Sequence, residues 1–280
     1  MPNLIGFLAF TLIPLIAGIV IAFTDWNVVS GIEGITFIGL SNFSNLLTDQ
    51  QFWYGLGRTF LYAGLGVPLT MLGGLVLALA LNGPVVGRGV LRLIFFFPHI
   101  VNQIAVGFVW LLLLHPAHGV VNIFLGGLGI EDPPTWLVSQ EWSLLTIILI
   151  TSWAGMGFHC VIFLSALQSV PPELHEAAQI DGAGWWRRFL TVTMRSLMPT
   201  ITFLGIMSMI SHAQGFGLIA FLTQGGPGDS STTLSYYMYQ RGFQWYQFGY
   251  AAAIGVLNAI GVLGLTVFMW RFQKGKGLYS

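Results

Sequence analysis

Charged residues are scarce in this sequence. Only 7% of its 280 residues are charged, against roughly 25% in an ordinary soluble domain, whereas 55% are hydrophobic. Ten Lys and Arg balance ten Asp and Glu. The chain therefore has neither the basic field that gathers nucleic acid nor an acidic solvating tail. We exclude nucleic acid as a partner and expect membrane lipid to be the principal solvent.

Cysteine is nearly absent as well. The single Cys160 lies in an apolar run and has no second cysteine with which to form an internal disulfide. A metal cluster would need several Cys or His residues at tight spacing. The pair His175-Glu176 does not begin a zinc-protease motif, because Gln179 stands where the second histidine would be. We predict no metal site and expect Cys160 to be a small buried hydrophobic residue.

The chain also lacks the motifs of an ATPase or another enzyme. No segment reads G-x-x-x-x-G-K-[ST], and Gly275-Lys276-Gly277 lacks both the earlier glycine and the hydroxyl residue. The apolar runs hold scattered His and Ser but no convergent catalytic set. We predict that the chain has no catalytic residue and binds no cofactor itself.

Long apolar runs dominate the rest. A hydrocarbon core about 30 Å thick needs roughly 20 apolar residues per helix. Six runs without Asp, Glu, Lys or Arg have this length, at 4–23, 59–81, 93–114, 144–167, 200–222 and 250–270. Continuous charge-free spans favour helices over a transmembrane barrel. We predict an all-α polytopic membrane protein with a single transmembrane domain over 1–280, whose first run is a retained helix because it lacks a basic start.

The basic residues predict the orientation, since Lys and Arg are retained on the cytoplasmic side. Most of them lie after the second, fourth and sixth runs, at Arg88, Arg92, Arg187, Arg188, Arg195, Arg271, Lys274 and Lys276. The other connections hold only Arg58 and Arg241. Both termini are therefore expected inside.

Small residues recur at every fourth position in two of the runs. They are Gly66, Thr70, Gly74 and Ala78 in the second run and Ala251, Gly255 and Ala259 in the sixth. Such stripes let helix backbones approach closely in lipid. We expect both stripes to lie in helix contacts.

The connection over 168–199 has the pattern of a short helix. Pro172 can occupy a helix start, Glu173 and Glu176 complement the positive end of the dipole, and Gly182 offers a stop. The alanines between them have small side chains, so this helix could bind closely in a groove of a partner protein. The alternative is an amphipathic helix that rests on the membrane surface.

Several segments resemble one family. Glu176-Ala177-Ala178 followed by Gly182 resembles the EAA signature of permease subunits in bacterial ABC importers. In the carbohydrate-uptake branch this signature extends to a form like that of 171–189 here. The segments 222–228, 248–253 and 37–43 resemble the "LTxGGP", "GxAxA" and "FVGLxNF" stretches of that branch, in matching order.

The resemblance implies a type I ABC importer transmembrane domain in a prokaryotic inner (plasma) membrane, multi-pass. It implies a partner ATPase homodimer that carries ATP and Mg, a second and different permease subunit, and an extracytoplasmic binding protein that delivers a sugar or related solute. The ATPase-coupling residues that it implies are Glu176, Ala177, Ala178, Asp181 and Gly182. The chain departs from the family at Met194-Arg195, where the pattern has Leu-Pro, so we expect Pro199 to supply the break before the fifth span.

Polar groups inside spans are costly and mark candidates for a solute path. With aromatic companions that could stack on sugar rings, our candidates are Trp153, Phe158, Ser211, His212, Gln214 and Asn258. Phe216 is a further aromatic companion, and the further polar groups of this kind are Asn102, Gln103, His159 and Ser208. Hydrogen bonds between helices are the alternative role for each. A secondary carrier or channel is the second functional hypothesis, but it predicts a charged residue within a span.

Overall fold

The computed structural model describes residues 2–274, with side chains described over 3–271. Its helices toward the N-terminus are α1 (Pro2–Phe7), η1 (Leu8–Leu12), α2 (Ile13–Ile21), η2 (Val28–Ser30), α3 (Ser41–Thr48), α4 (Gln50–Asn82), α5 (Arg88–Ile100), α6 (Gln103–Leu113) and α7 (Val120–Gly127). Those that follow are η3 (Trp136–Val138), α8 (Ser143–Gln168), α9 (Pro172–Ile180), α10 (Trp185–Arg188), η4 (Phe189–Thr193), α11 (Met194–Ala213), α12 (Gly217–Leu222), α13 (Leu234–Tyr239), η5 (Gln240–Gln244) and α14 (Phe248–Lys274).

The predicted all-α polytopic class is confirmed. The described strands are β1 (Thr24–Asp25) and β2 (Thr36–Phe37), which form an antiparallel two-stranded ribbon. Within the described chain, five helices are long and apolar enough to cross a membrane, and a sixth crossing results if α5 and α6 form one broken span. The inward position of both termini stays a prediction.

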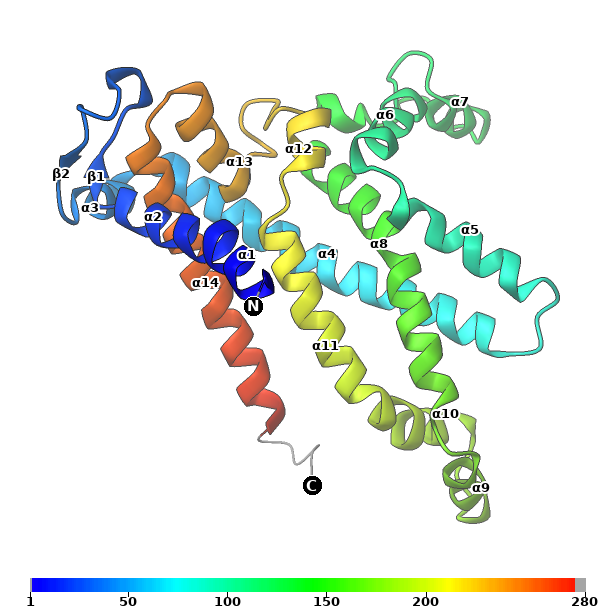
Figure 1. Ribbon diagram of the computed structural model, residues 1–280. Helices are drawn as coiled ribbons and strands as arrows, with labels where there is room; N and C mark the ends of the chain where they lie inside the picture. Colours follow the sequence, from blue (N-terminus) through cyan, green and yellow to red (C-terminus); the bar gives the residue numbers. More distant parts are fainter. Residues whose placement is uncertain (1, 275–280) are drawn as a thin grey trace.

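The helices α4 and α8 form the centre of the bundle and pack along much of their length (Figure 1). The 33 residues of α4 make it about 50 Å long, longer than the membrane core. It starts well before the expected run at 59 because the Asp49 side chain caps its first turn.

The two small-residue stripes have different surroundings. Gly66, Thr70, Gly74 and Ala78 are all buried, and a Cβ on Gly74 would lie 3.0 Å from the Met156 carbonyl of α8. The expected helix contact is therefore confirmed for α4. Along α14 the expectation fails in part, because Ala259 is exposed and the stripe lines an open groove.

The expected single helix over 93–114 is instead two helices. Helices α5 and α6 meet at a bend of 100°. Val101 is extended, and the Asn102 side chain accepts a hydrogen bond from the Ile104 N–H at 2.8 Å. An asparagine that caps a new helix ends the previous one, which explains the break. Asn102 is thus a helix cap.

The expected break at Pro199 is wrong. Helix continues from Trp185 through a π-helical turn into α11, and Pro199 lies inside α11. Proline removes one backbone donor, and packing of α11 against α4, α8 and α14 compensates for that single loss.

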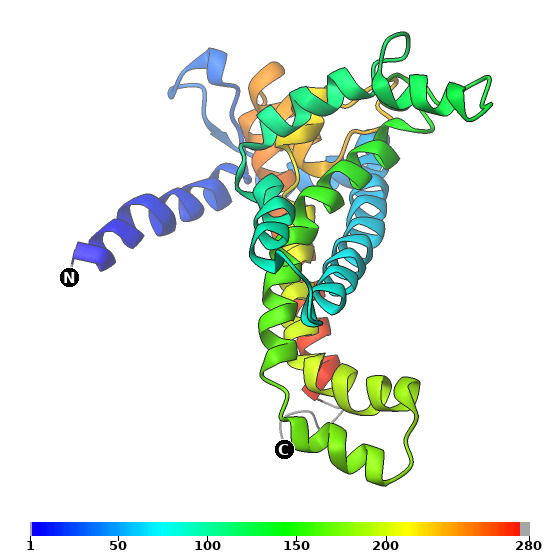
Figure 2. The same ribbon diagram turned by 90° about the vertical axis from the view of Figure 1, so that its right-hand side faces the viewer.

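The molecule has two distinct ends. The ribbon, α3, α7 and α13 lie at one end, here called the ribbon end, and α9 and α10 lie at the other, here called the α9 end (Figure 1). Helices α1 and α2 project sideways from the bundle (Figure 2), and none of this span's apolar window is buried.

Candidate functional site

Helix α9 projects from the bundle as a short hairpin with α10 (Figure 2). Pro172 stands at its first turn and Glu173 is the acidic residue there, as the sequence pattern predicts. Its nearest packing is against α10 and η4, with one side-chain link, in which Arg188 Nη1 donates to Gln179 Oε1 at 3.0 Å. No residue of α9 is buried, so the helix is free to contact another protein.

A glycine ends this helix. Gly182 has a φ of 75°. Its N–H donates to the Gln179 carbonyl at 3.0 Å, and the Ala183 N–H donates to the Ala178 carbonyl at 2.9 Å. These two bonds form a Schellman motif, which requires a left-handed residue at the position of Gly182. A Cβ would meet no atom there, so only the backbone conformation favours glycine.

The predicted coupling residues lie together on this projection. Glu176, Ala177, Asp181 and Gly182 are exposed, and Ala178 is half-buried. Close by, Leu174 and Ile180 are 48% and 87% exposed. An exposed acid beside uncovered apolar side chains on a projecting helix is suited to a protein groove.

Helix α11 carries a second uncovered surface. Phe203 and Met207 are 53% and 49% exposed, and Ser211 and Gln214 continue the same face toward the ribbon end. Residues three or four apart share one side of a helix. We call these four residues the α11 stripe. In Figure 1 this helix runs down the middle, with α2 and α14 on one side and α8 and α5 on the other.

A cavity and a groove flank the α11 stripe. The cavity, of about 310 Å³, is bounded by α4, α5, α6, α8, α11 and α12. The groove, of about 880 Å³, is bounded by α2, α11, α13, η5 and α14. Among the described residues, neither lining contains Asp, Glu, Lys or Arg. Both sites are therefore suited to uncharged ligands.

The structure separates the predicted path residues into two groups. Phe158, Ser211 and His212 line the cavity. Gln214 and Asn258 line the groove.

Trp153 lies apart from both groups. Its ring packs edge-on against Trp110, with centroids 5.4 Å apart. The sequence pattern therefore identified residues on both sides of the α11 stripe but did not show that they belong to two sites.

Two histidines in this cavity are held by the serine between them. His159 Nδ1 lies 3.0 Å from the Gly155 carbonyl, and His212 Nδ1 lies 2.8 Å from the Ser208 carbonyl. Because carbonyls only accept, both Nδ1 atoms carry the proton. The Ser208 hydroxyl then donates to His159 Nε2 at 2.7 Å. In neutral imidazoles this arrangement leaves His212 Nε2 as a buried acceptor with no described partner.

An ion-pair node fastens the ribbon end. Asp49 Oδ1 accepts from the Gln51 N–H at 2.9 Å, while Oδ2 accepts from Arg241 at 3.3 Å and from the hydroxyls of Tyr237 and Tyr250. We call Asp49, Arg241, Tyr237 and Tyr250 the Asp49 node. Burial alone would raise the pKa of Asp49, but these hydrogen bonds and the Arg241 charge hold it below its usual range.

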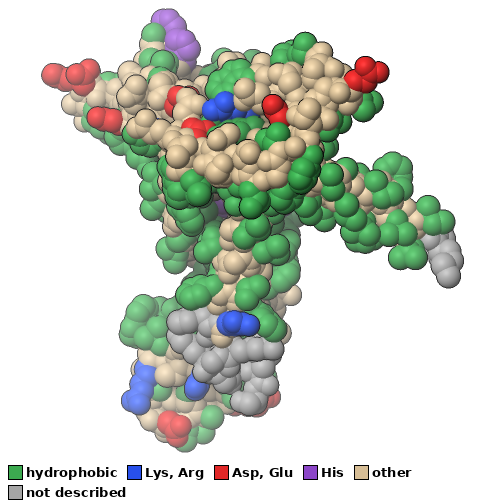
Figure 3. All heavy atoms as spheres, turned by 90° about the vertical axis from the view of Figure 1, so that its left-hand side faces the viewer, with side chains coloured by type: hydrophobic (Ala, Val, Ile, Leu, Met, Phe, Trp, Pro, Cys, Tyr) green, Lys and Arg blue, Asp and Glu red, His purple; other side chains and the backbone are tan. Residues whose placement is uncertain are grey.

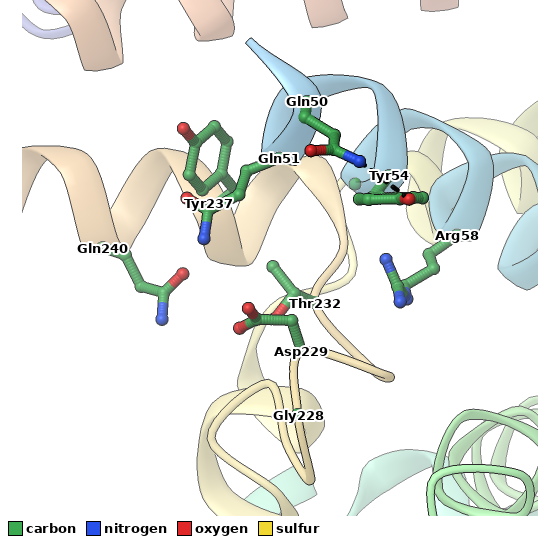
Figure 4. Close-up of a pocket in the computed structure, with 10 residues that line it drawn as sticks. Gln50, Gln51, Tyr54, Arg58, Gly228, Asp229, Thr232, Tyr237 and Gln240 are labelled. Carbon is green, nitrogen blue, oxygen red and sulfur yellow. Dashed lines mark hydrogen bonds between the residues drawn. The ribbon is translucent and has the colours of Figure 1, made fainter.

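A polar cup of about 280 Å³ opens beside this node. Figure 4 shows the side chains of Arg58 and Asp229 facing the space between α4 and the loop before α13. Arg58 Nε donates to the Ser230 carbonyl at 2.9 Å, and its guanidinium lies 5.5 Å from the Tyr54 ring centroid. In Figure 3, acidic side chains gather at this ribbon end, and most of the basic ones in view lie toward the α9 end.

A family model matches residues 70–274, and it describes the binding-protein-dependent transport system inner membrane component. The match covers α8, α9, α11 and α14, together with the last part of α4, from residue 70. The chain belongs to this family. The permease is therefore a multi-pass inner-membrane protein of the ABC importer class, and the resemblance seen in its sequence is confirmed.

Curated relatives agree over nearly the whole permease. The probable ABC transporter permease protein YesP of Bacillus subtilis is 34% identical over 273 residues, covering 95% of this chain and 87% of the relative. The diacetylchitobiose uptake system permease protein NgcF of Streptomyces coelicolor is also 34% identical, and the match covers 97% of this chain and 80% of the relative. The glycerol-3-phosphate transport system permease protein UgpA of Agrobacterium fabrum is 33% identical, and the match covers 87% of this chain and 83% of the relative. The relatives are transport permease subunits, several of them named for sugar transport.

Solved structures share the permease's fold. A chain of a bacterial ABC transporter that imports alginate has a TM-score of 0.84 and 28% identity, covering 98% of this chain and 93% of that one. The alginate transporter bound to a periplasmic protein that carries an alginate pentasaccharide matches with a TM-score of 0.82, covering 96% and 90%.

Sequence reasoning missed the Asp49 node, and it named His159 and Ser208 singly without pairing them. Asp49 directly precedes a charge-free run, which is a capping signal that could have been used. Its long-range partners, Arg241 and the two tyrosines, carry no local signal.

Proposed function

We propose that this permease forms half of a translocation path for a neutral sugar. The single observation that carries the proposal is the α11 stripe, an uncovered face flanked by an uncharged cavity and an uncharged groove. A second, different permease subunit would cover this face and close the path. The path would then be lined by Phe158, Ser211, His212, Gln214 and Asn258. Trp153 would lie outside both the cavity and the groove.

Among the described residues, neither lining holds a cation, and this favours a neutral solute. Names among the relatives include a diacetylchitobiose system and a trehalose/maltose system, but also glycerol-3-phosphate. A phosphate ester would require a positive partner in the path. Uncharged polar lining groups such as the Ser211 hydroxyl and the Gln103 amide suit a sugar better.

The energy would come from partner subunits. Glu176, Ala177, Ala178, Asp181 and Gly182 would seat α9 in the surface cleft of an ATPase homodimer that binds ATP and Mg. Closure of that dimer would pull on α9. The pull would reach α11 because helix is continuous from Trp185, shortly after α9, into α11. This permease would itself hydrolyse nothing and would bind no cofactor.

The ribbon end would receive the extracytoplasmic binding protein. Its cup offers Arg58, Asp229 and three glutamines, so it can pair with polar side chains of either sign. The prediction that α9 faces the cytoplasm places this cup on the outer surface.

Uptake by the assembled transporter tests the proposal. The ATPase, the second permease and the binding protein are purified with this chain, reconstituted in proteoliposomes and supplied with a panel of neutral sugars. Glu176→Lys should abolish ATP-dependent uptake, because it reverses the charge at the docking surface. Glu173→Lys, the same change three residues earlier on α9, serves as the control and should retain most of it.

The same assay distinguishes a secondary carrier. Uptake that needs an ion gradient but neither ATP nor the ATPase would contradict the importer assignment. Equal uptake by both charge-reversal variants would contradict the docking role of Glu176.

A further inference from the structure

Two arginines stand at the start of helix α5. Arg88 is its first residue and Arg92 follows one turn later, so the two side chains share one face of the helix. The turn that joins α4 to α5 lies on the side of the bundle that faces α9 (Figure 2). We call Arg88 and Arg92 the α5 arginine pair. Both residues are half-buried.

These two guanidinium groups lack a counter-charge. Over residues 3–271, where side chains are described, neither group forms a hydrogen bond or an ion pair. The buried atoms without a partner are Nε and Nη2 of Arg88 and Nε of Arg92. Nε and Nη2 form the edge with which an arginine binds a phosphate through two parallel hydrogen bonds. A buried charged donor without an acceptor is costly, so this position favours an anion.

The helix start adds to this cost. The positive end of a helix dipole lies at the N-terminus, where acidic residues are favourable and basic residues are not. Helix α5 has no acidic residue in its first turn, and Gly87, with a φ of 73°, provides no capping side chain. The α5 arginine pair therefore adds two positive charges to an uncapped positive end. One bound phosphate offsets the dipole and both arginines together.

The backbone of α5 is fixed against the bundle. Leu91 and Phe95 pack against the buried core that α4, α8 and α11 share. A Cβ on Gly157 of α8 would overlap the Phe95 carbonyl, so the two helices are in close contact. The backbone thus cannot move the charges apart. Each arginine is partly exposed, however, and its long side chain can turn its covered edge outward by rotation about its own bonds.

The surroundings indicate where the phosphate comes from. On the opposite face of α5, four apolar side chains are each more than half exposed: Val90, Leu93, Ile94 and Phe97. Val86, in the turn before the helix, is 97% exposed. A phospholipid can place its phosphate at the start of α5 and its acyl chains along this apolar face. A free phosphate ion gains nothing from these apolar contacts.

We propose that the α5 arginine pair binds the phosphate of an anionic phospholipid in the leaflet nearer to α9. The headgroup neutralises both arginines and holds the turn between α4 and α5. Through the close contact of α5 with α8, it also stabilises the helix that ends just before α9. The site is independent of the solute that is carried, so it stands apart from the proposed function.

The test uses the full chain in nanodiscs of phosphatidylcholine, with and without phosphatidylglycerol. Native mass spectrometry measures the lipid that stays bound, and thermal unfolding measures stability. Wild type should retain phosphatidylglycerol about tenfold more strongly than phosphatidylcholine and should melt at a higher temperature when it is present. The double variant Arg88→Gln with Arg92→Gln should lose both differences. In phosphatidylcholine alone it should melt no lower than wild type, because it removes uncompensated cations.

Arg195→Gln is the matched control, since Arg195 is an exposed arginine of α11 outside the pair. It should leave lipid retention within about twofold of wild type. Lysine at both positions of the pair keeps the charge but lacks the two-donor edge, so it should restore part of the preference. Inorganic phosphate, titrated against the bound lipid, distinguishes a free ion from a headgroup and should not displace the lipid.

Other results would overturn the proposal. Equal retention of phosphatidylglycerol by wild type and the glutamine variant would show that the pair does not bind lipid. Displacement by inorganic phosphate would make a free ion the ligand. An equal loss of stability in both lipid compositions would show that the arginines support the fold itself. Failure of the variant to assemble with the ATPase, at unchanged lipid retention, would assign the pair to a protein contact.

Discussion

The two ends of this permease are built in opposite ways. The α9 end depends on residues within about one helix of each other, such as the Gly182 and Ala183 bonds to the last turn of α9. The ribbon end depends on groups far apart in sequence, since Asp49 bonds to Tyr250, 201 residues away. The α9 end projects from the bundle with little burial, whereas the ribbon end is interlocked, which means that hydrogen bonds join residues far apart in the sequence. The difference agrees with our proposal that the α9 end transmits motion, and it leads us to expect that the ribbon end provides stability.

Asp49→Ala should produce the largest loss of stability. It removes the acceptor of Tyr237, Tyr250 and Arg241 and the cap of α4, at a cost of about 3 kcal/mol. Thermal unfolding in detergent measures this. Glu33→Ala, at an exposed glutamate of the same end, should change the free energy of unfolding by less than about 0.5 kcal/mol. Similar losses from both substitutions would contradict the account of the Asp49 node.

Thr59→Val should have the next largest effect. The Thr59 hydroxyl accepts from the Leu234 N–H at 2.9 Å, and both residues are buried. Its loss leaves a buried donor without a partner, which costs about 2 kcal/mol. Thr48→Val, at an exposed threonine of α3, is the matched control and should be nearly neutral. If denaturant unfolding gave the same midpoint for both variants, the interlocked description of this end would be wrong.

Acid should loosen the ribbon end before the α9 end. The pKa of Asp49 is lower in the folded protein than its ordinary value of 3.8. Its contribution is therefore fully present above the unfolded pKa and is lost as the pH falls through the folded value. The stability of wild type minus that of Asp49→Asn should shrink as the pH drops below about 4. A difference that stays constant with pH would show that the Asp49 charge contributes nothing.

Gly182→Val should have the smallest effect on global stability. A left-handed valine costs roughly 1–2 kcal/mol, but the last turn of α9 can unwind without disturbing the bundle. We expect an unchanged melting temperature, faster amide exchange at Ala183 and a loss of sugar-stimulated ATP hydrolysis. Gly182→Asn tolerates the left-handed conformation better and should retain most of the coupling. A lower melting temperature for the valine variant would place α9 within the stable core.

The same contrast explains what the sequence could predict. Spans are recognised from charge-free length, and α9 from Pro172, Glu173 and Gly182, because these signals are local. The break at Asn102 was missed because the cap lies inside an apolar run. A helix break was predicted at Pro199 because proline usually ends a helix, but the packing of α11 overrides this local preference.

The site was predictable only in part. Phe158, Ser211, His212, Gln214 and Asn258 stand out as polar or aromatic groups within spans. Their division between a cavity and a groove depends on how α11 packs, which no single span encodes. The Asp49 node joins the cap of α4 to residues of α13, η5 and α14, so it has no pattern that a sequence could show.

Accessibility of a cysteine placed on α9 tests the central claim most directly. The native Cys160 is buried, so Ala177→Cys can be labelled with a water-soluble maleimide over a low background. The subunit in a lipid nanodisc should react rapidly, and assembly with the ATPase should protect it. Leu47→Cys, at a position of α3 that is 65% exposed, should react equally with and without the ATPase. Protection of Ala177→Cys by lipid alone, or no protection by the ATPase, would contradict the assignment of α9 as the coupling helix.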